Sequence, residues 1–430
     1  MRRMKTTFIA TLLLTAVNLH FATPARAAED YVAHEWGTFT SVQGADGVQL
    51  EWNPFITSEL PDFVYDPFKK HGARSRNAGI KPAFRTLQRM ETPVIYFYAD
   101  TERTVDVTVK FPQGNVTEWY PQIRALPPAK TNDLSRGAPR EIHWDKVRVL
   151  PPPTIATTDR PLPFDKSGSH YYAARETDAN LLSVTPRAGQ REEVEKFLFY
   201  RGVGDFRAPL IASLKDDRDT VEMRNSGTEP LRNLFTYAVR NGHGKFLHVE
   251  SLLPGETKTV RLADAKQTLP LSELRRDIAK EMQAALVKEG LYDREASAMV
   301  KTWDDSWFAE TGLRVLYVLS REWTDRTLPL TLNPAPKSLA RVMVGRAELI
   351  TPGMEQQLAA QITRFTAADA ATRPQIVEAT RRLDLGRFLE PAFRRVTSGK
   401  TDAAFKKSSA ELMQLVSQPV VTAKPFASVR

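Results

Sequence analysis

The chain has 430 residues and contains no cysteine. Disulfides, thiolate metal sites, iron–sulfur clusters, c-type haem attachment and cysteine nucleophiles are therefore excluded. Stability has to come from the burial of apolar side chains. A bound metal would have to be held by histidine, carboxylate or carbonyl oxygen, and such ligands suit zinc, calcium or manganese. If the protein uses a cofactor, we expect a divalent metal bound by histidine and carboxylate.

Long apolar runs are also scarce. The run at residues 8–17 is shorter than the stretch of about 20 residues that a membrane-spanning helix needs. A basic start precedes it, and the small-residue ending Ala25-Arg26-Ala27 follows, which is typical of a secretory signal peptide. No later stretch approaches membrane-spanning length. We predict that residues 1–27 are a signal peptide and that the remainder is a soluble, exported protein, periplasmic or secreted.

Charge of one sign is in slight excess only. The chain has 60 Lys and Arg against 51 Asp and Glu, a formal net charge of +9. Part of this excess lies in the predicted signal peptide, in Arg2, Arg3, Lys5 and Arg26. The remaining positive charge is spread over a chain long enough for two or three domains. A nucleic-acid partner would need a clustered basic face, so we expect none.

The first half of the chain after the signal peptide shows short strand patterns separated by turns. Residues 105–111 alternate apolar and polar with period two, as a half-buried strand does. Prolines crowd residues 125–164 and predict loops there. We predict a β-rich domain with proline-rich loops at residues 28–190. Residues 191–266 resemble an immunoglobulin-like β module, and both parts are expected to be β-sandwich-like.

A helical period begins after Pro270. Leu271, Leu274, Ile278 and Met282 fall on one helix face, and further helical patterns occupy the region after residue 351. Between them we expect three companion strands of one small sheet, at residues 313–319, 328–332 and 339–350. Residues 267–430 are therefore predicted to form a helix-rich α+β domain that ends in helices, and the whole chain is expected to be α+β.

Five segments carry a resemblance to a known family. They are residues 32–42 (VAHEWGTFTSV), 91–98 (ETPVIYFY), 197–204 (FLFYRGVG), 303–308 (WDDSWF) and 341–350 (RVMVGRAELI). In these segments the chain resembles a family of exported bacterial proteins to which no activity is assigned. The resemblance spans most of the chain and supports export, but it implies no activity, cofactor or site residue.

The segment at residues 168–179 is the densest in chemically active side chains. It contains His170, Arg175, Glu176 and Asp178. In a strand, His170 and Glu176 would project to one face and Arg175 to the other, so the histidine and carboxylate could serve as base and orienter or as metal ligands. The alternative is a surface strand in which Arg175 pairs with Glu176 or Asp178. We take these four residues as catalytic candidates.

A metal site would draw on histidines from several segments. His34, His143 and His170 are the candidate ligands, provided that folding brings them together. His34 and Glu35 are neighbours in a strand-like run and should point to opposite faces, so one ion cannot bind both without a bulge. The alternative for His34 is a hydrogen-bonded histidine at the rim of a β core. His243, beside two glycines, is expected in a solvated turn.

Two further features have one structural and one functional interpretation. Arg201 follows a strand in a glycine-containing segment that lacks the lysine and length of a phosphate loop. It is a candidate anion contact and the fifth catalytic candidate. Trp303 and Trp307 lie on one helical face, where they would form either core packing or a sugar-stacking platform.

These observations leave two functional hypotheses. The first is a non-catalytic envelope or secreted binding module whose partner is a polysaccharide or an envelope protein, because the chain has no recognised catalytic motif. The alternative is a His/carboxylate-dependent hydrolase, with or without a metal, acting outside the cytoplasm. The position of His34, His143 and His170 relative to one another discriminates between them.

Overall fold

The computed structural model describes residues 29–54, 60–66, 85–124, 138–152, 161–185, 191–215, 219–383, 385 and 388–417. The predicted signal peptide lies outside these residues. None of the described helices is both long and apolar enough to cross a membrane.

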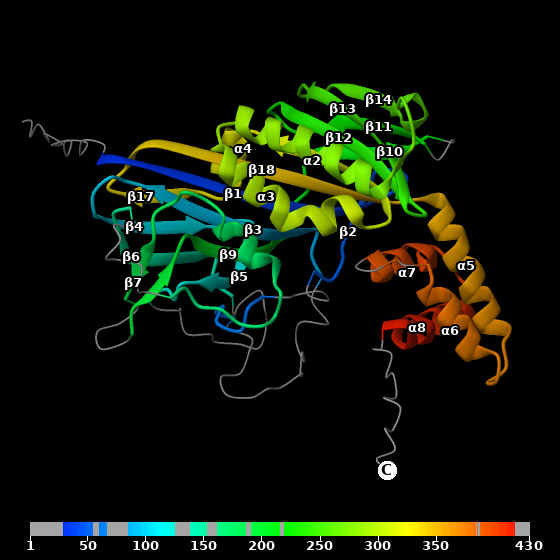
Figure 1. Cartoon of the computed structure of the whole chain (residues 1–430). Coiled ribbons are helices and arrows are strands. Elements are labelled where there is room, and N and C mark those ends of the chain that lie inside the picture. The colour runs from blue at the N-terminus through cyan, green and yellow to red at the C-terminus, as the bar shows by residue number, and fades with distance from the viewer. Residues whose placement is uncertain are drawn as a thin grey trace, which may run out of the picture.

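A ten-stranded sheet forms the centre of the molecule (Figure 1). Its central strands are β1 (Glu29–Gly44) and β18 (Pro336–Ile350), which run parallel to each other although about 300 residues separate them. The strand order is β15, β13, β12, β16, β18, β1, β3, β9, β5, with β2 attached to β1. The remaining bounds are β2 Gln49–Leu50, β3 Gln88–Tyr98, β5 Gly114–Tyr120, β9 Leu198–Gly204, β12 Leu231–Arg240, β13 His243–Leu252, β15 Leu269–Pro270 and β16 Gly312–Leu319.

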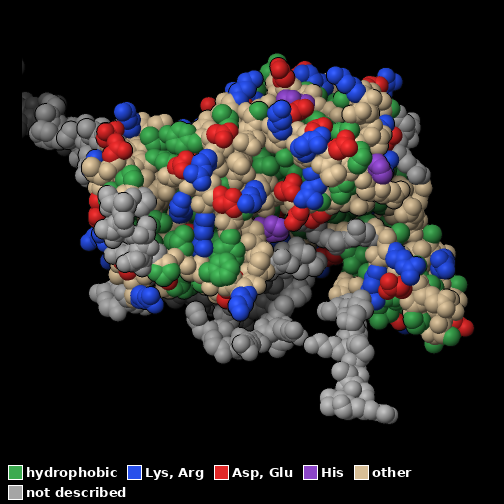
Figure 2. All heavy atoms as spheres, in the orientation of Figure 1, with side chains coloured by type: hydrophobic (Ala, Val, Ile, Leu, Met, Phe, Trp, Pro, Cys, Tyr) green, Lys and Arg blue, Asp and Glu red, His purple; other side chains and the backbone are tan. Residues whose placement is uncertain are grey.

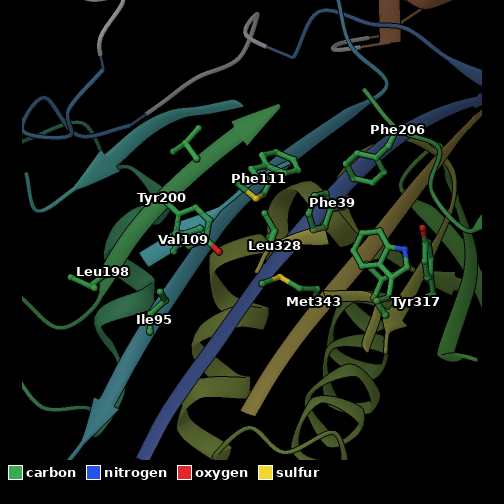
Figure 3. Packing of buried hydrophobic residues seen from close by; sticks show 14 of the residues in the cluster. Phe39, Ile95, Val109, Phe111, Leu198, Tyr200, Phe206, Tyr317, Leu328 and Met343 are labelled. Carbon is green, nitrogen blue, oxygen red and sulfur yellow. The ribbon is translucent and has the colours of Figure 1, made fainter. Parts of the chain in front are cut away.

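Two smaller sheets pack against one face of the central sheet. The first contains β10 (Leu210–Leu214), β11 (Thr220–Asn225) and β14 (Thr257–Arg261). The second has the order β17, β4, β6, β7, β8, with bounds Leu330–Asn333, Arg103–Lys110, Glu141–Val149, Leu182–Val184 and Glu193–Glu195. One hydrophobic cluster joins all three sheets, and Figure 3 shows Phe39, Phe111, Phe206 and Met343 within it. This arrangement confirms the predicted α+β class with a β-sandwich-like part.

Helices cover the other face of the central sheet. α2 (Leu271–Lys288), α3 (Asp293–Asp304) and the π-helical turn η4 (Asp305–Ala309) pack on it through a second hydrophobic cluster. Trp303 and Trp307 belong to this cluster, with rings stacked at 6.3 Å and exposed fractions of 6% and 0%. They are core residues, and a sugar-stacking platform would need them at the surface.

The C-terminal helices form a bundle at one end of the sheet, drawn in orange and red in Figure 1. They are α5 (Pro352–Ala367), α6 (Arg373–Arg381), α7 (Leu389–Thr397) and α8 (Ala403–Ser417). Their core includes Val42, Trp52 and Ile350 from the sheet and its neighbourhood. Arg395 also forms an ion pair with Asp46 at 3.1 Å. The bundle therefore packs on the end of the sheet where β1, β2 and β18 meet.

The central sheet takes strands from all three predicted parts of the chain, so the boundaries at residues 190 and 266 do not divide one sheet from another. The predicted small C-terminal sheet is wrong. β16 and β18 are neighbours in the central sheet, whereas β17 pairs with β4 in the five-stranded sheet. The short helix α4 (Arg321–Thr327), which the sequence patterns did not indicate, redirects the chain between β16 and β17.

Candidate functional site

The segment with the predicted catalytic residues contains a 3-10 helix, η2 (His170–Arg175), and not the strand that the sequence analysis considered. Ser169 caps it by accepting a hydrogen bond from the Tyr171 backbone nitrogen. Tyr171 and Ala174, three residues apart, are the buried pair, which is the period of a 3-10 helix. His170 is exposed at the start of this helix. The arrangement expected in a strand, with His170 and Glu176 on one face, is therefore absent.

Arg175 is held by a buried carboxylate and does not point to solvent. Its Nε and Nη2 donate to the two oxygens of Glu195, at 3.0 and 2.6 Å. The guanidinium also lies over the ring of Tyr172, 5.0 Å from its centroid. Burial alone would lower the pKa of Arg175, but Glu195 raises it above its ordinary value. Arg175 is therefore a charged anchor between η2 and β8.

Glu176 and Asp178 pair with cations of α3. Lys301 Nζ contacts both oxygens of Glu176, at 2.5 and 2.7 Å, and Arg294 contacts Asp178. All four side chains are more than half exposed. Such pairs contribute at most about 1 kcal/mol each, because water screens them. Figure 2 shows the same interspersion of acidic and basic side chains across this face of the molecule.

The three histidines predicted as metal ligands are not brought together. Among the described residues, one group of three or more histidine and carboxylate side chains has ligand atoms all within 4.8 Å of one another. It consists of Asp106, His143 and Asp145, and contains neither His34 nor His170. Of the predicted ligand set, the structure retains His143 alone, with two aspartates that the sequence analysis did not select.

A bulge between β4 and β6 builds this group. The register moves from Val105 opposite Val147 to Val107 opposite Trp144, so that β6 carries extra residues facing Asp106. Lys146 in the bulge has φ +51°, a left-handed conformation. Its backbone nitrogen donates to Asp106 Oδ1 at 2.8 Å. Bulges re-aim side chains in this way, and here the result is a convergence of ligands on the outer face of the sheet.

The chemistry of the group suits a divalent cation. His143 is half-exposed, its Nδ1 bonds to Thr108 Oγ1 at 2.7 Å, and its Nε2 contacts Asp145. A second partner that fixes the imidazole orientation is a regular feature of metal-binding histidines. One nitrogen and two carboxylates match the preferences of zinc or manganese. Arg124 pairs with the other oxygen of Asp145, which competes with a cation for that carboxylate.

His34 forms a separate histidine–carboxylate pair on the helical face. Its Nδ1 lies 2.7 Å from Glu295 Oε2, and Tyr98 donates its hydroxyl to Glu295 Oε1 at 2.7 Å. Burial, and then Glu295, raise the pKa of Tyr98, so this hydroxyl stays a donor. The ring of Tyr292 stacks near His34 at 4.4 Å. The hydrogen bond of the predicted alternative is therefore present, but His34 is 4% exposed and lies in a central strand of the sheet.

Glu35 points to the opposite face from His34, as the strand period predicts. Tyr200 donates its hydroxyl to Glu35 Oε1 at 2.6 Å, and Arg341 Nε donates to Oε2 at 2.6 Å. Arg341 Nη1 continues to Asp325 at 2.7 Å. Glu35 and Arg341 are both buried. The pair was not found from sequence, because its two members are 306 residues apart.

Arg201, the predicted anion contact, is buried in β9 and lies opposite Glu118 of β5 in the strand register. The strand register therefore places Arg201 beside the carboxylate of Glu118. We therefore do not assign it to a ligand.

A second buried charged set crosses the helical face of the sheet. Arg346 Nε donates to Glu348 Oε1 at 2.5 Å, and Arg314 Nε lies 2.8 Å from the same oxygen. On β18 this set separates Val344, which packs under α2 and α3, from Ile350, which packs under the C-terminal bundle. Because these charges partner one another, we assign the set to the packing between the two helical layers.

A pocket of about 270 Å³ opens beside the N-terminal half of β18. It is lined by the end of β16, the start of α4, the end of α2, the start of β12 and the edge of β18. The lining residues are Arg232, Glu289, Val318, Leu319, Ser320, Arg321, Glu322, Leu339, Ala340, Arg341 and Val342. The lining combines apolar side chains with those of three arginines and two glutamates. Several of these residues lie in strands expected from the sequence, but none of them was selected there as a site candidate.

No protein-family model and no curated protein matches the chain. Among solved structures, the Fcho1 Mu homology domain from Danio rerio with bound Eps15 peptide is 8% identical. That match covers 76% of this chain and 99% of the other, with a TM-score of 0.31. The yeast delta-COP-I mu-homology domain complexed with Dsl1 WxWxV peptide is 5% identical, covering 75% and 98%, with a TM-score of 0.26. At these TM-scores the likeness establishes neither a shared fold nor a shared function.

Proposed function

We propose that the protein is an exported, non-catalytic module that binds a partner outside the cytoplasm, either a polysaccharide or an envelope protein. Export rests on the signal-peptide pattern of residues 1–27. The observation that carries the binding role is the pocket beside β18, whose lining combines apolar and charged side chains. Concave sites are the usual place for a ligand.

The surroundings of the catalytic candidates support the same proposal. Arg175 is anchored by Glu195, while Glu176 and Asp178 are paired with basic side chains of α3. A carboxylate whose oxygens already contact a cation has to give up that partner before it can accept a proton from a substrate. No hydrogen bond or ion pair joins the His170 ring to any residue of the described ranges.

A binding panel tests this function. The protein without residues 1–27 is titrated against immobilised polysaccharides and purified envelope proteins. We expect saturable binding to one class, and a loss of affinity of about tenfold in Ala340→Gln, which places a longer side chain in the pocket. Ala404→Gln, on an exposed position of α8, is the matched control and should bind normally. Absence of binding across the panel, together with turnover of any substrate, contradicts the proposal.

One observation favours the second candidate, a His/carboxylate hydrolase. Glu295 fixes His34 through Nδ1, which is the relation between a general base and its orienting carboxylate. The test is a panel of ester, amide and glycoside substrates with wild type, His34→Gln and Glu295→Gln. A hydrolase of this kind should lose at least about a hundredfold in kcat with His34→Gln but not with His243→Gln, a variant of an exposed turn histidine. Equal rates in the two variants remove this candidate.

A further inference from the structure

β18 has two edges that are paired over different lengths. On one side β1 accompanies it from Pro336 to Ile350. On the other side β16 pairs with it only from Met343 to Leu349, because β16 ends where α4 follows. Within the described part of the chain, residues 337–342 therefore have no strand partner on the β16 side.

The backbone groups on this open side can be identified. The carbonyl oxygens of Val344 and Arg346 face β1, since Thr38 and Ser41 donate their hydroxyls to them at 3.0 and 3.4 Å. Backbone direction alternates along a strand, so the backbone groups of odd-numbered residues in this part of β18 face away from β1.

Leu339 fits this assignment, because its carbonyl accepts from Arg321 Nη1 at 2.5 Å. The backbone N–H groups of Leu339 and Arg341 then point into the open side. Because β16 pairs with β18 only as far as Met343, no strand of the described residues faces these two N–H groups on that side.

The pocket occupies the path that β16 would follow if it continued. Its lining takes in Val318 and Leu319 at the end of β16, residues 339–342 of β18 and Glu289 at the end of α2. A volume of about 270 Å³ is at the lower limit of small-ligand sites. It fits a short piece of extended chain, whose remainder would run along the edge toward Lys337.

The rim favours an acidic occupant. The side chains of Arg232 and Arg321 are 53% and 46% exposed. Lys337, exposed on the same edge, adds a third cation. The three cations pair with Glu289, Asp325 and Asp30 at the surface, where such pairs are weak and an acidic ligand can replace them. On the acidic side of the rim, Glu289 is 14% exposed and already bonded to Arg232, which leaves Glu322 as the exposed acid of the lining.

We propose that this edge of β18 binds an extended, acidic peptide segment of a partner protein, which adds as a strand in the line of β16 beyond Leu319. The inference rests on the proposed binding function and names its partner class. Main-chain hydrogen bonds to Leu339 and Arg341 supply the affinity, and the pocket and the arginines supply the selectivity. The exposed Arg321 side chain turns away from the Leu339 carbonyl and meets an acidic side chain instead. Before the peptide binds, Arg321 and Lys337 protect the edge of β18 from pairing with other chains.

The first experiment uses three pools of synthetic linear octapeptides with the protein lacking residues 1–27. The pools are rich in Asp and Glu, neutral, or rich in Lys and Arg. We expect the acidic pool to bind at least about tenfold more tightly than the other two, and the difference to shrink with added salt. The double variant Arg232→Gln/Arg321→Gln should bring the acidic and neutral pools within about threefold of each other.

The second experiment locates the peptide by hydrogen exchange resolved to single residues. With a tight-binding acidic peptide, the amides of Leu339 and Arg341 should become protected. The amide of Ala340, which already faces β1, should change little. Leu339→Pro removes one of the two edge donors and should weaken binding by about tenfold or more. Ser338→Ala, whose backbone faces β1, is the control. If Leu339→Pro fails to fold, the exchange pattern of the wild type decides.

The outcomes separate this inference from the proposed function. Binding of a polysaccharide but of no peptide pool overturns the peptide edge and leaves the binding function standing. Peptide binding with protection outside residues 337–342 also overturns the edge. If no polysaccharide, envelope protein or peptide binds, both proposals fail.

Discussion

Glu35 and Arg341 lie directly opposite each other on the parallel strands β1 and β18, and their side chains form a buried ion pair. Arg341 Nε and Nη2 both reach the same carboxylate oxygen at 2.6 Å, while Tyr200 donates to the other oxygen. Burial alone would lower the pKa of Arg341, but Glu35, Tyr200 and Asp325 raise it. The pair therefore stays charged inside the sheet and joins the first strand of the fold to its last.

Breaking this pair on one side should be costly. Arg341→Met leaves the Glu35 carboxylate buried without its cation, and we expect the free energy of unfolding to fall by about 3 to 5 kcal/mol. The double variant Glu35→Gln/Arg341→Met should recover part of this loss, since no buried charge remains. Urea unfolding followed by circular dichroism measures both. Arg261→Met, which breaks an exposed pair with Asp264, should cost less than about 1 kcal/mol. Similar losses in Arg341→Met and Arg261→Met would refute the prediction.

The segment with the catalytic candidates gives a second contrast in stability. Arg175→Met leaves Glu195, which is fully buried, without its bidentate partner. We expect a loss of about 2 kcal/mol or more in the free energy of unfolding. Glu176→Gln removes an exposed pair with Lys301 and should cost under about 1 kcal/mol. Thermal unfolding of both variants checks the order. If Glu176→Gln is the more damaging, the anchoring role of Arg175 is wrong.

The group of Asp106, His143 and Asp145 predicts a response to zinc. Adding zinc to chelator-treated protein should raise the midpoint of thermal unfolding, because a ligand that binds only the folded state stabilises it. His143→Ala should abolish the rise, while His170→Ala, at an exposed position outside the group, should keep it. Elemental analysis of protein purified without chelator is the companion measurement. An unchanged midpoint in the wild type would mean that the group is an ion-pair cluster and not a metal site.

His248 predicts a loss of stability in mild acid. Its ring stacks on Phe235 at 4.3 Å, and burial lowers its pKa below the ordinary 6.5, against the opposing effect of Glu281 and Glu250. As the pH falls below 6.5, His248 takes up a proton in the unfolded chain. In the folded protein it does so only at the lowered pKa. The contribution of the neutral His248 ring to the free energy of unfolding is complete above pH 6.5 and is lost as the pH falls from 6.5 to the lowered pKa.

Replacing the ring tests this directly. His248→Phe keeps an aromatic stack on Phe235 but cannot be protonated. The difference in urea midpoint between about pH 7.5 and about pH 5.5 should be smaller in this variant than in the wild type. The exposed His243 serves as control, and His243→Phe should leave the difference unchanged. An identical acid response in His248→Phe would show that other groups cause it.

Local patterns in the sequence located most strands and helices. The alternation of residues 105–111 corresponds to β4, and the helical spacing after Pro270 corresponds to α2. Both signals depend only on neighbours within a few residues, which is why they survive without knowledge of the fold. The same approach failed at η2, where Ser169 caps a 3-10 turn and the side chains resemble those of a strand. A short element of this kind has too few residues to show a period.

The candidate sites were less accessible from sequence. His143 was selected, but Asp106 and Asp145 became its neighbours only through a bulge between two strands. Glu295 reaches His34 from a helix 261 residues away. The pocket beside β18 exists because β16 stops at Leu319 while β18 begins at Pro336, a difference in strand length that no local pattern contains.

The sequence by itself determined the absence of any thiol chemistry, the positions of most regular elements and the opposite facing of His34 and Glu35. Each of these follows from residue identity or from backbone geometry over a few residues. Only the tertiary structure decided that the first and last strands pair in parallel, that Glu35 meets Arg341, and that one edge of β18 stays open. These depend on which apolar faces pack together across hundreds of residues, and that choice is made by the burial of the whole core.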